Sequence, residues 1–270
     1  EPAMDGGMWV STERALHKFI GERLVLSLAA TTGLPNGDVR VIHESPDGRL
    51  FVGTFGGGLA VFDAASLQAA KPAKPLQVIT TEDGLSSNYV WAFHLGTNGD
   101  WWLGTDNALN RVAGSSISHL SQAHGLPADH VNEIIEAPAG VLWISSDEGV
   151  ARVSIADLTS FAQAPAAAAA VQTFSWYDGM PDTETNGQKS QPAGCVPRDG
   201  RVLFPTTQGV AVFDAAETNH VARVAPPVIT LARTAQGTLI SDSLRTKDPA
   251  ASPLLPMGTE TIRLGPGTSR

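Results

Sequence analysis

The strongest structural signal in the chain is Gly99-Asp100-Trp101-Trp102-Leu103-Gly104-Thr105, in which a small turn leads into an aromatic-centred strand that ends in threonine. Related stretches recur along the chain, as Gly48-Arg49-Leu50-Phe51-Val52-Gly53-Thr54, Gly140-Val141-Leu142-Trp143-Ile144-Ser145-Ser146, Gly200-Arg201-Val202-Leu203-Phe204-Pro205-Thr206 and, in part, Gly7-Met8-Trp9-Val10-Ser11-Thr12. Self-similarity at a period of roughly 40 to 50 residues is typical of repeat architectures such as propellers. The sequence therefore predicts one structural unit that is copied several times.

Two further elements belong to each copy. A Gly-Leu-Pro-like turn precedes the aromatic strand, as Gly33-Leu34-Pro35, Gly84-Leu85-Ser86, Gly125-Leu126-Pro127 and Gly179-Met180-Pro181. A small residue followed by an aliphatic one comes after it, as Ala15-Leu16, Gly58-Leu59, Ala108-Leu109, Gly149-Val150 and Gly209-Val210. Each copy is predicted to form four short strands, for example 39–44, 50–54, 59–63 and 76–80. We expect the aromatic side chain to fill the wedge between adjacent sheets and the small residue to let the next strand approach closely.

The predicted fold class is all-β, with β-propeller blades of four antiparallel strands that form an incomplete ring. The blades are expected over residues 1–224, as a leading half blade at 5–30 and units that start at about 33, 84, 125 and 179. Ala/Pro/Lys-rich insertions at 64–75 and 162–170 are expected to be surface excursions, with a possible helical turn at 166–170. The few copies favour a piece of a longer protein.

Composition excludes several classes of function. The 270 residues carry a net charge of -9 with 18 scattered Lys and Arg, so no basic stripe is present for nucleic acid. Cys195 is the only cysteine, which excludes an intrachain disulfide and a CxxC metal or redox pair. No run of about 18 apolar residues occurs, so this segment itself is not expected to contact a membrane.

The stretch from 176 to 213 carries the most specific resemblance to a known family. It contains Tyr177-Asp178-Gly179-Met180, Asn186-Gly187, Gln191-Pro192-Ala193-Gly194, Arg198-Asp199-Gly200 and Phe204-Pro205-Thr206. These residues resemble the final blade of the two-component-regulator propeller repeat, and the likeness covers roughly residues 5–215. The following Pro226-Pro227-Val228-Ile229 resembles the start of the Y_Y_Y-type Ig-like β-sandwich, so 225–270 is expected to be a truncated start of that domain.

The resemblance implies a function. Members of this family are periplasmic sensor regions of histidine kinases and diguanylate cyclases, so the segment is expected to bind a small-molecule or saccharide ligand and relay a signal. It also implies a homodimer in the full-length protein. The segment itself is expected to be no enzyme, with kinase or cyclase activity elsewhere in the parent protein.

The residues offer little chemistry. None of the seven histidines pair at metal-ligand spacing, and no metal or cofactor is expected. His43 and His94 hold matching places in the repeat, which favours a structural role over proton transfer. Glu133, Glu136 and Asp147 are not expected to act as a catalytic pair, and the glycines at 56–58 are expected to make a tight turn.

Binding is easier to place than catalysis. The loop after each Gly-Leu-Pro turn is expected to reach the mouth of the central channel, where polar and aromatic side chains suit a polar or saccharide-like ligand. The candidate ligand-binding residues are Asn36, Asp38, Asn88, Tyr89, Asp129, His130, Thr185 and Asn186. Turn capping by Asn and Asp is an equally good interpretation of each one singly.

Two alternatives remain open. Some propellers are lyases or hydrolases that open sugars or lactone rings with inward histidines and acids, so an enzyme is the first. A protein-interaction scaffold without a small-molecule site is the second.

Overall fold

The computed structural model describes residues 1–68, 71–163, 170–187, 191–216, 231–234 and 237–241. The chain divides into two compact units, Glu1–Thr218 and Asn219–Arg270. The predicted boundary between residues 224 and 225 lies outside the described residues.

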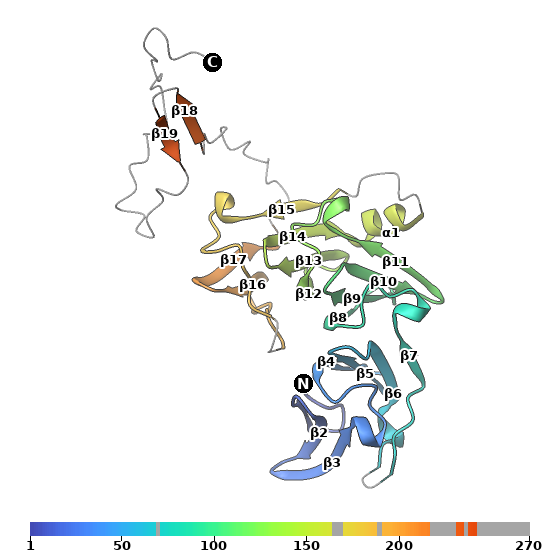
Figure 1. Cartoon of the computed structure of the whole chain (residues 1–270). Coiled ribbons are helices and arrows are strands. Elements are labelled where there is room, and N and C mark those ends of the chain that lie inside the picture. The colour runs from blue at the N-terminus through green and yellow to red at the C-terminus, as the bar shows by residue number, and fades with distance from the viewer. Residues whose placement is uncertain (69–70, 164–169, 188–190, 217–230, 235–236, 242–270) are drawn as a thin grey trace. The chain divides into compact units, whose positions relative to one another are not determined.

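The first unit is built from antiparallel sheets that follow one another in chain order (Figure 1). We call each sheet a blade. Blade 1 holds β1 (Met8–Ser11), β2 (Ala15–Ile20) and β3 (Arg23–Ala29); blade 2 holds β4 (Val39–Glu44), β5 (Arg49–Thr54), β6 (Leu59–Asp63) and β7 (Gln77–Ile79). Blade 3 holds β8 (Val90–Leu95), β9 (Trp101–Thr105), β10 (Leu109–Ala113) and β11 (Ser116–Leu120); blade 4 holds β12 (Val131–Glu136), β13 (Val141–Ser146), β14 (Gly149–Ser154) and β15 (Gln172–Phe174). Blade 5 holds β16 (Arg201–Thr206) and β17 (Gly209–Asp214). The predicted fold class is confirmed.

The first and last blades depart from the four-stranded pattern. Blade 1 was expected to be a half blade but has three strands, and Pro2 forms a bridge to Met8 where an innermost strand would lie. In blade 5, bridges from Thr185 to Thr206 and from Cys195 to Leu203 stand in for the innermost strand. Within the described residues, β17 pairs with β16 alone.

The strand register places the aromatic column in equivalent positions. Each member of the column lies opposite a third-strand residue at the same step of its hairpin, in the pairs Trp9↔Lys18, Phe51↔Val61, Trp102↔Arg111, Trp143↔Arg152 and Leu203↔Val212. The four aromatic members are about 1% exposed. The predicted repeat is therefore a structural repeat, because the five positions share one register and the four aromatic side chains are equally buried.

Four hydrophobic cores lie between consecutive blades. In each, the aromatic residue of one blade packs with the residues that flank the aromatic position in the next blade, because successive side chains of a strand point to opposite faces. We call the aromatic side of a blade its front face and the opposite side its back face. The front-to-back sets are Trp9 and Leu16 with Leu50 and Val52; Phe51 and Leu59 with Leu103 and Val112; Trp102 and Leu109 with Leu142 and Ile144; Trp143 and Val150 with Val202 and Phe204.

The small residues of the repeat have the predicted role at two positions. A Cβ atom on Gly58 would lie 2.1 Å from the carbonyl oxygen of Ile79, and one on Gly149 would lie 2.4 Å from that of Phe174. Both carbonyls belong to the fourth strand of the blade. Glycine therefore allows the third and fourth strands to approach each other at this corner.

One helix, α1 (Ile155–Gln163), joins β14 to β15 and was not predicted. Ser154 caps it, since its Oγ accepts from the amide of Asp157 at 3.0 Å and donates to the carboxylate of Asp157 at 2.6 Å. Leu158 and Phe161 pack into the core between blades 3 and 4. The sequence does contain the features that predict this helix: a Ser-x-x-Asp cap, followed by apolar residues spaced three apart so that they share one helix face. The turn expected at 166–170 lies almost wholly outside the described residues.

The second unit is described only as an antiparallel hairpin of β18 (Leu231–Thr234) and β19 (Gly237–Ser241). Most of the expected sandwich segment therefore falls outside the described residues. Across the described ranges, no helix has the length and apolar character needed to cross a membrane.

Candidate functional site

Three equivalent β-bulges shape one end of the inner strands. In blades 2, 3 and 4 the pairing of the first and second strands shifts around the second residue of the first strand, which leaves Arg40, Trp91 and Asn132 as the extra residues. A bulge re-aims the side chain that it carries and leaves its backbone without a ladder partner. We name the side chains gathered here the mouth cluster: Asp38, Arg40, Phe55, Tyr89, Trp91, Asp106, His130, Asn132 and Asp147.

The aromatic part of the mouth cluster spans blades 2 and 3. The ring of Phe55 lies 4.5 Å from that of Tyr89 and 5.5 Å from that of Trp91, measured between centroids. The guanidinium of Arg40 lies over Phe55 at 5.0 Å and over Trp91 at 5.3 Å, within the range of cation–π attraction. Trp91 is buried, whereas Phe55 and Tyr89 are exposed. The rings of Phe55 and Tyr89, tilted by 56° to each other, therefore offer an apolar surface to solvent.

The polar part of the cluster continues into blade 4. The indole Nε1 of Trp91 donates to Asp106, and its ring lies 5.3 Å from that of His130. His130 Nδ1 lies 2.9 Å from one oxygen of Asp147, and Asn132 Nδ2 donates to the other at 2.8 Å. These contacts link the carboxylates of Asp106 and Asp147 to the aromatic part of the cluster through Trp91 and His130.

The structure divides the eight candidate residues. Asp38, Tyr89 and His130 belong to the mouth cluster, and Asn36 supports it because its side-chain amide donates to the carbonyl of Phe55 at 2.8 Å. The others are placed as follows: Asn88 and Asp129 accept from the amides of Thr81 and Gln122 at 2.8 and 2.7 Å, Thr185 is buried and donates to the carbonyl of Ser146, and Asn186 is exposed. Asn88 and Asp129 are therefore caps of the preceding turns.

Sequence reasoning missed six members of the cluster: Arg40, Phe55, Trp91, Asp106, Asn132 and Asp147. Phe55, Asp106 and Asp147 could have been found, because each directly follows the threonine or serine that ends the second strand of its blade. The other three occupy the bulges. Without the bulges, simple alternation along the strand assigns these side chains to the wrong face.

A segment of blade 5 crosses to the inner strands of blades 3 and 4. Gln191 Nε2 donates to the carbonyls of Trp91 and Asn132, both at 2.9 Å, so it satisfies two of the bulge residues. The amide of Ala193 donates to Glu133 Oε2 at 2.6 Å, and the amide of Ile134 donates to the other oxygen at 2.9 Å. Burial raises the pKa of Glu133 to about 7, although both backbone N–H groups act to lower it.

The two histidines of the repeat lie near the other end of their strands. The His43 ring packs against Phe93 at 5.5 Å, and His94 Nε2 lies 2.9 Å from Glu136 Oε2 in the next blade. Burial tends to raise the pKa of Glu136, but hydrogen bonds from Thr97, Gly140 and His94 outweigh it and hold the pKa at about 2. His94 and Glu136 thus tie blade 3 to blade 4.

Replacing Glu136 by glutamine is expected to lower the free energy of unfolding at pH 7 by about 1–3 kcal/mol, because an amide leaves some of these donors unpaired. The depressed folded pKa also means that the wild-type carboxylate stabilises the fold above about pH 4.5, and that this contribution is lost as the pH falls through about 2. Urea unfolding at neutral and acid pH measures both effects. Glu13→Gln, at an exposed glutamate, is the control. If Glu136→Gln lost stability at acid pH as much as the wild type does, Glu136 would not be the group responsible.

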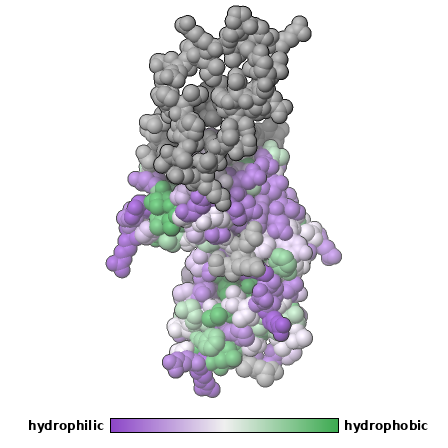
Figure 2. Space-filling view, turned by 60° about the vertical axis from the view of Figure 1, so that its left-hand side comes forward, coloured by the Kyte–Doolittle hydropathy of each residue, from purple (hydrophilic) through white to green (hydrophobic). Residues whose placement is uncertain are grey.

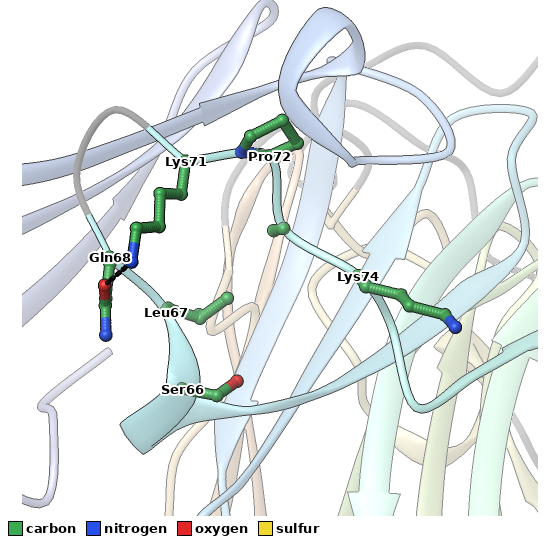
Figure 3. A pocket seen from close by; sticks show the side chains of 7 residues that line it. Ser66, Leu67, Gln68, Lys71, Pro72 and Lys74 are labelled. Carbon is green, nitrogen blue, oxygen red and sulfur yellow. Dashed lines mark hydrogen bonds between the residues drawn. The ribbon is translucent and has the colours of Figure 1, made fainter.

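A separate pocket lies in the insertion between β6 and β7, lined by Ser66, Leu67, Gln68, Lys71, Pro72, Ala73 and Lys74 (Figure 3). Lys71 Nζ donates to Gln68 Oε1 at 2.7 Å, and Lys74 points away from the other side chains. All of its lining comes from one surface insertion, so it lacks the convergence of several blades seen in the mouth cluster. In the part of the chain that the structure describes, no three His, Cys, Asp or Glu residues are grouped to hold a metal ion.

Comparison with known proteins agrees with this architecture. Residues 33–56 match the family described as the two component regulator propeller. No curated protein matches the chain. The extracellular domain of the hybrid two component system BT3049 from B. thetaiotaomicron is similar in structure, with a TM-score of 0.67, 19% identity, and coverage of 92% of this chain and 31% of that domain.

Two further solved structures are similar. The extracellular domain of the hybrid two component system BT4673 from B. thetaiotaomicron has a TM-score of 0.62 at 15% identity, over 81% of this chain and 28% of that one. Virginiamycin B lyase from Staphylococcus aureus has a TM-score of 0.50 at 13% identity, over 79% and 68%. The chain spans about a third of the length of the two extracellular domains. These likenesses show a β-propeller fold, with a two-component-regulator repeat at 33–56.

Proposed function

We propose that the blades of this chain are the ligand-binding part of an extracytoplasmic sensor, and that they do not catalyse a reaction. The repeat match at 33–56 and the two extracellular domains of two-component systems support the sensor class. The finer proposal is a periplasmic sensor region that acts as a homodimer, continues into an Ig-like domain, and relays its signal to a histidine kinase or diguanylate cyclase.

The mouth cluster is the proposed binding site, and one observation carries it. The exposed ring of Phe55 lies against the exposed ring of Tyr89 and the buried Trp91. Trp91 in turn contacts Asp106 and His130, and His130 lies within hydrogen-bond distance of Asp147. Exposed aromatic rings near directed hydrogen-bonding groups suit a saccharide-like ligand. The positive charge of Arg40 is paired with Asp38 at 2.5 Å. The cluster also contains the carboxylates of Asp106 and Asp147, which would repel an anion. A neutral ligand therefore fits better than an anionic one.

Removing one ring of the surface is the direct test. A library of neutral and acidic glycan oligomers is screened by thermal shift; a ligand at 100 times its Kd should stabilise the fold by about 2.7 kcal/mol. We expect Tyr89→Ala to weaken binding at least tenfold, because it deletes half of the exposed aromatic pair. Tyr177→Ala is the matched control, since Tyr177 is also exposed but lies outside the mouth cluster.

The outcomes separate the candidate functions. Equal loss of binding in Tyr89→Ala and Tyr177→Ala would place the ligand elsewhere. No stabilisation by any glycan, in a protein that unfolds cooperatively, would favour the scaffold. Turnover of a saccharide or lactone that disappears in the His43→Ala/His94→Ala double variant would overturn the sensor proposal in favour of an enzyme.

A further inference from the structure

One side chain of blade 5 is hydrogen-bonded to two bulges of the mouth cluster at once. We call residues 185–187 and 191–195 the inner segment of blade 5. Within it, Gln191 Nε2 donates to the carbonyl oxygens of Trp91 in blade 3 and Asn132 in blade 4, both at 2.9 Å. A bulge leaves its extra residue unpaired in the ladder, so a donor from outside the sheet stabilises it. Gln191 therefore holds the backbone beneath two side chains of the mouth cluster.

The inner segment is also packed closely on blade 4 on both sides of Gln191. The amide of Ala193 donates to Glu133 Oε2 at 2.6 Å and to Gln191 Oε1 at 3.1 Å. A Cβ atom on Gly187 would lie 2.7 Å from Asn132 Cβ and 2.9 Å from its carbonyl oxygen. Glycine therefore allows the segment to approach the bulge of blade 4 directly.

These contacts are shielded from water. On the face of the molecule that Figure 2 shows, hydrophobic residues lie in separate patches among hydrophilic ones, and hydrogen bonds at such a surface compete with solvent. Ala193 and Glu133, by contrast, are 2% and 6% exposed. Hydrogen bonds in such surroundings are stronger, and a buried group that loses its partner costs more free energy. The inner segment and the bulges therefore stabilise each other.

The inner segment belongs to blade 5 and carries its position to the rest of that blade. Bridges join Thr185 to Thr206 and Cys195 to Leu203 of β16. The four hydrophobic cores each join consecutive blades, whereas Gln191 joins blade 5 to blade 3 as well as to blade 4. It is thus a direct contact between the aromatic part of the mouth cluster and the last blade.

We propose that Gln191 is a positioning residue of the mouth cluster and couples the conformation of this cluster to that of blade 5. A ligand that moves the backbone of Trp91 or Asn132 changes the two hydrogen bonds of Gln191, and with them the packing of the inner segment. The coupling is reciprocal, so a change in blade 5 acts on the mouth cluster with the same free energy. Its use in signalling rests on the proposed function, because a ligand at the mouth cluster has to cause the movement.

Fluorine NMR of the chain labelled with 5-fluorotryptophan tests the effect of blade 5 on the cluster. The chain has six tryptophans, and Trp91→Phe assigns the resonance of Trp91. Gln191→Met removes both donated hydrogen bonds without adding a charge, so the resonance of Trp91 should shift while that of Trp9 in blade 1 stays in place. Gln77→Met, at an exposed glutamine of blade 2, is the matched control and should leave the Trp91 resonance unchanged.

Hydrogen exchange tests the opposite direction. Asp106, which follows β9 in blade 3, accepts from the indole Nε1 of Trp91. Asp106→Ala disturbs the cluster from blade 3, so the amide of Ala193 should exchange about fivefold faster, the lower end of the usual coupling between sites. Amides of β5 in blade 2 should keep their rates, which excludes a general loss of stability. Asp100→Ala is the matched control, because Asp100 precedes β9 and accepts from Arg111 instead.

Both measurements are made without a glycan, so their failure is distinct from failure of the proposed function. An unmoved Trp91 resonance in folded Gln191→Met would overturn the proposal, and so would unchanged exchange at Ala193 in Asp106→Ala. If Gln191→Met does not fold, the exchange measurement decides alone. Glycan binding that depends on Tyr89, in a chain without the coupling, would retain the binding site and remove the role of Gln191.

Discussion

Replacing Trp143 by alanine is expected to lower the free energy of unfolding by about 3–5 kcal/mol, the usual loss when a large aromatic residue is removed from a core. Trp143 is 1% exposed, and its ring lies 5.6 Å from that of Phe174 and 5.1 Å from that of Phe213. Its Nε1 donates to the carbonyl of Ala137 at 2.6 Å. The alanine variant loses the contact between blades 4 and 5 and leaves that carbonyl without its donor.

Urea unfolding with linear extrapolation measures the change, and Trp176→Ala is the matched control. Trp176 is exposed, so the same substitution there should cost less than about 1 kcal/mol. A loss of similar size in the two variants would mean that the aromatic column does not hold neighbouring blades together. Because a repeat protein is stabilised by nearest-neighbour interfaces, we also expect blade 5 to lose protection from hydrogen exchange before blade 2.

The second large effect is a loss of stability between weakly acidic and neutral pH that depends on Glu133. Its folded pKa is raised from 4.5 to about 7, so the folded state binds the proton more tightly than the unfolded state. The contribution of Glu133 to stability is therefore greatest below about pH 4.5, falls as the pH rises towards 7, and no longer changes with pH above it. The loss is on the order of 3 kcal/mol, at 1.36 kcal/mol for each unit of pKa difference.

Unfolding of the wild type and of Glu133→Gln across pH 5 to 8, in steps of about one unit, measures the effect. The variant should lack most of the slope, because its amide does not titrate, and it should be less stable than wild type at pH 5, because only one amide oxygen remains for Ala193 and Ile134. Glu136→Gln should keep the slope, since Glu136 titrates far below this range. A slope that is equal in wild type and Glu133→Gln would show that other groups cause it.

The blade repeat could be predicted because it is a property of local sequence. Each copy contains its own turn, aromatic strand and small corner residue, so comparison of the copies was enough to find the strands and the aromatic column. The capped helix α1 was also within reach, since Ser154 and Asp157 form a recognisable start. The helix was not predicted there, because the only helical turn expected from the sequence was assigned to the alanine run at 166–170.

The mouth cluster could be predicted only in part. Asp38, Tyr89 and His130 were found because they lie between a turn and a strand, where the chain must reach one end of the blades. Asn88 and Asp129 share that location, but they cap turns by accepting from Thr81 and Gln122. Short polar side chains serve both purposes, and the sequence does not distinguish them.

By itself the sequence determined the all-β class, the blades and the residues that fill the wedges between them, since these depend on patterns that each blade carries internally. Only the tertiary structure decided which side chains meet across blades. The bulges at Arg40, Trp91 and Asn132 change the face of a side chain, and the burial of Glu133 depends on a segment some sixty residues further along the chain. A one-residue change of register and a long-range contact leave no periodic trace in the sequence, because neither repeats with the strand.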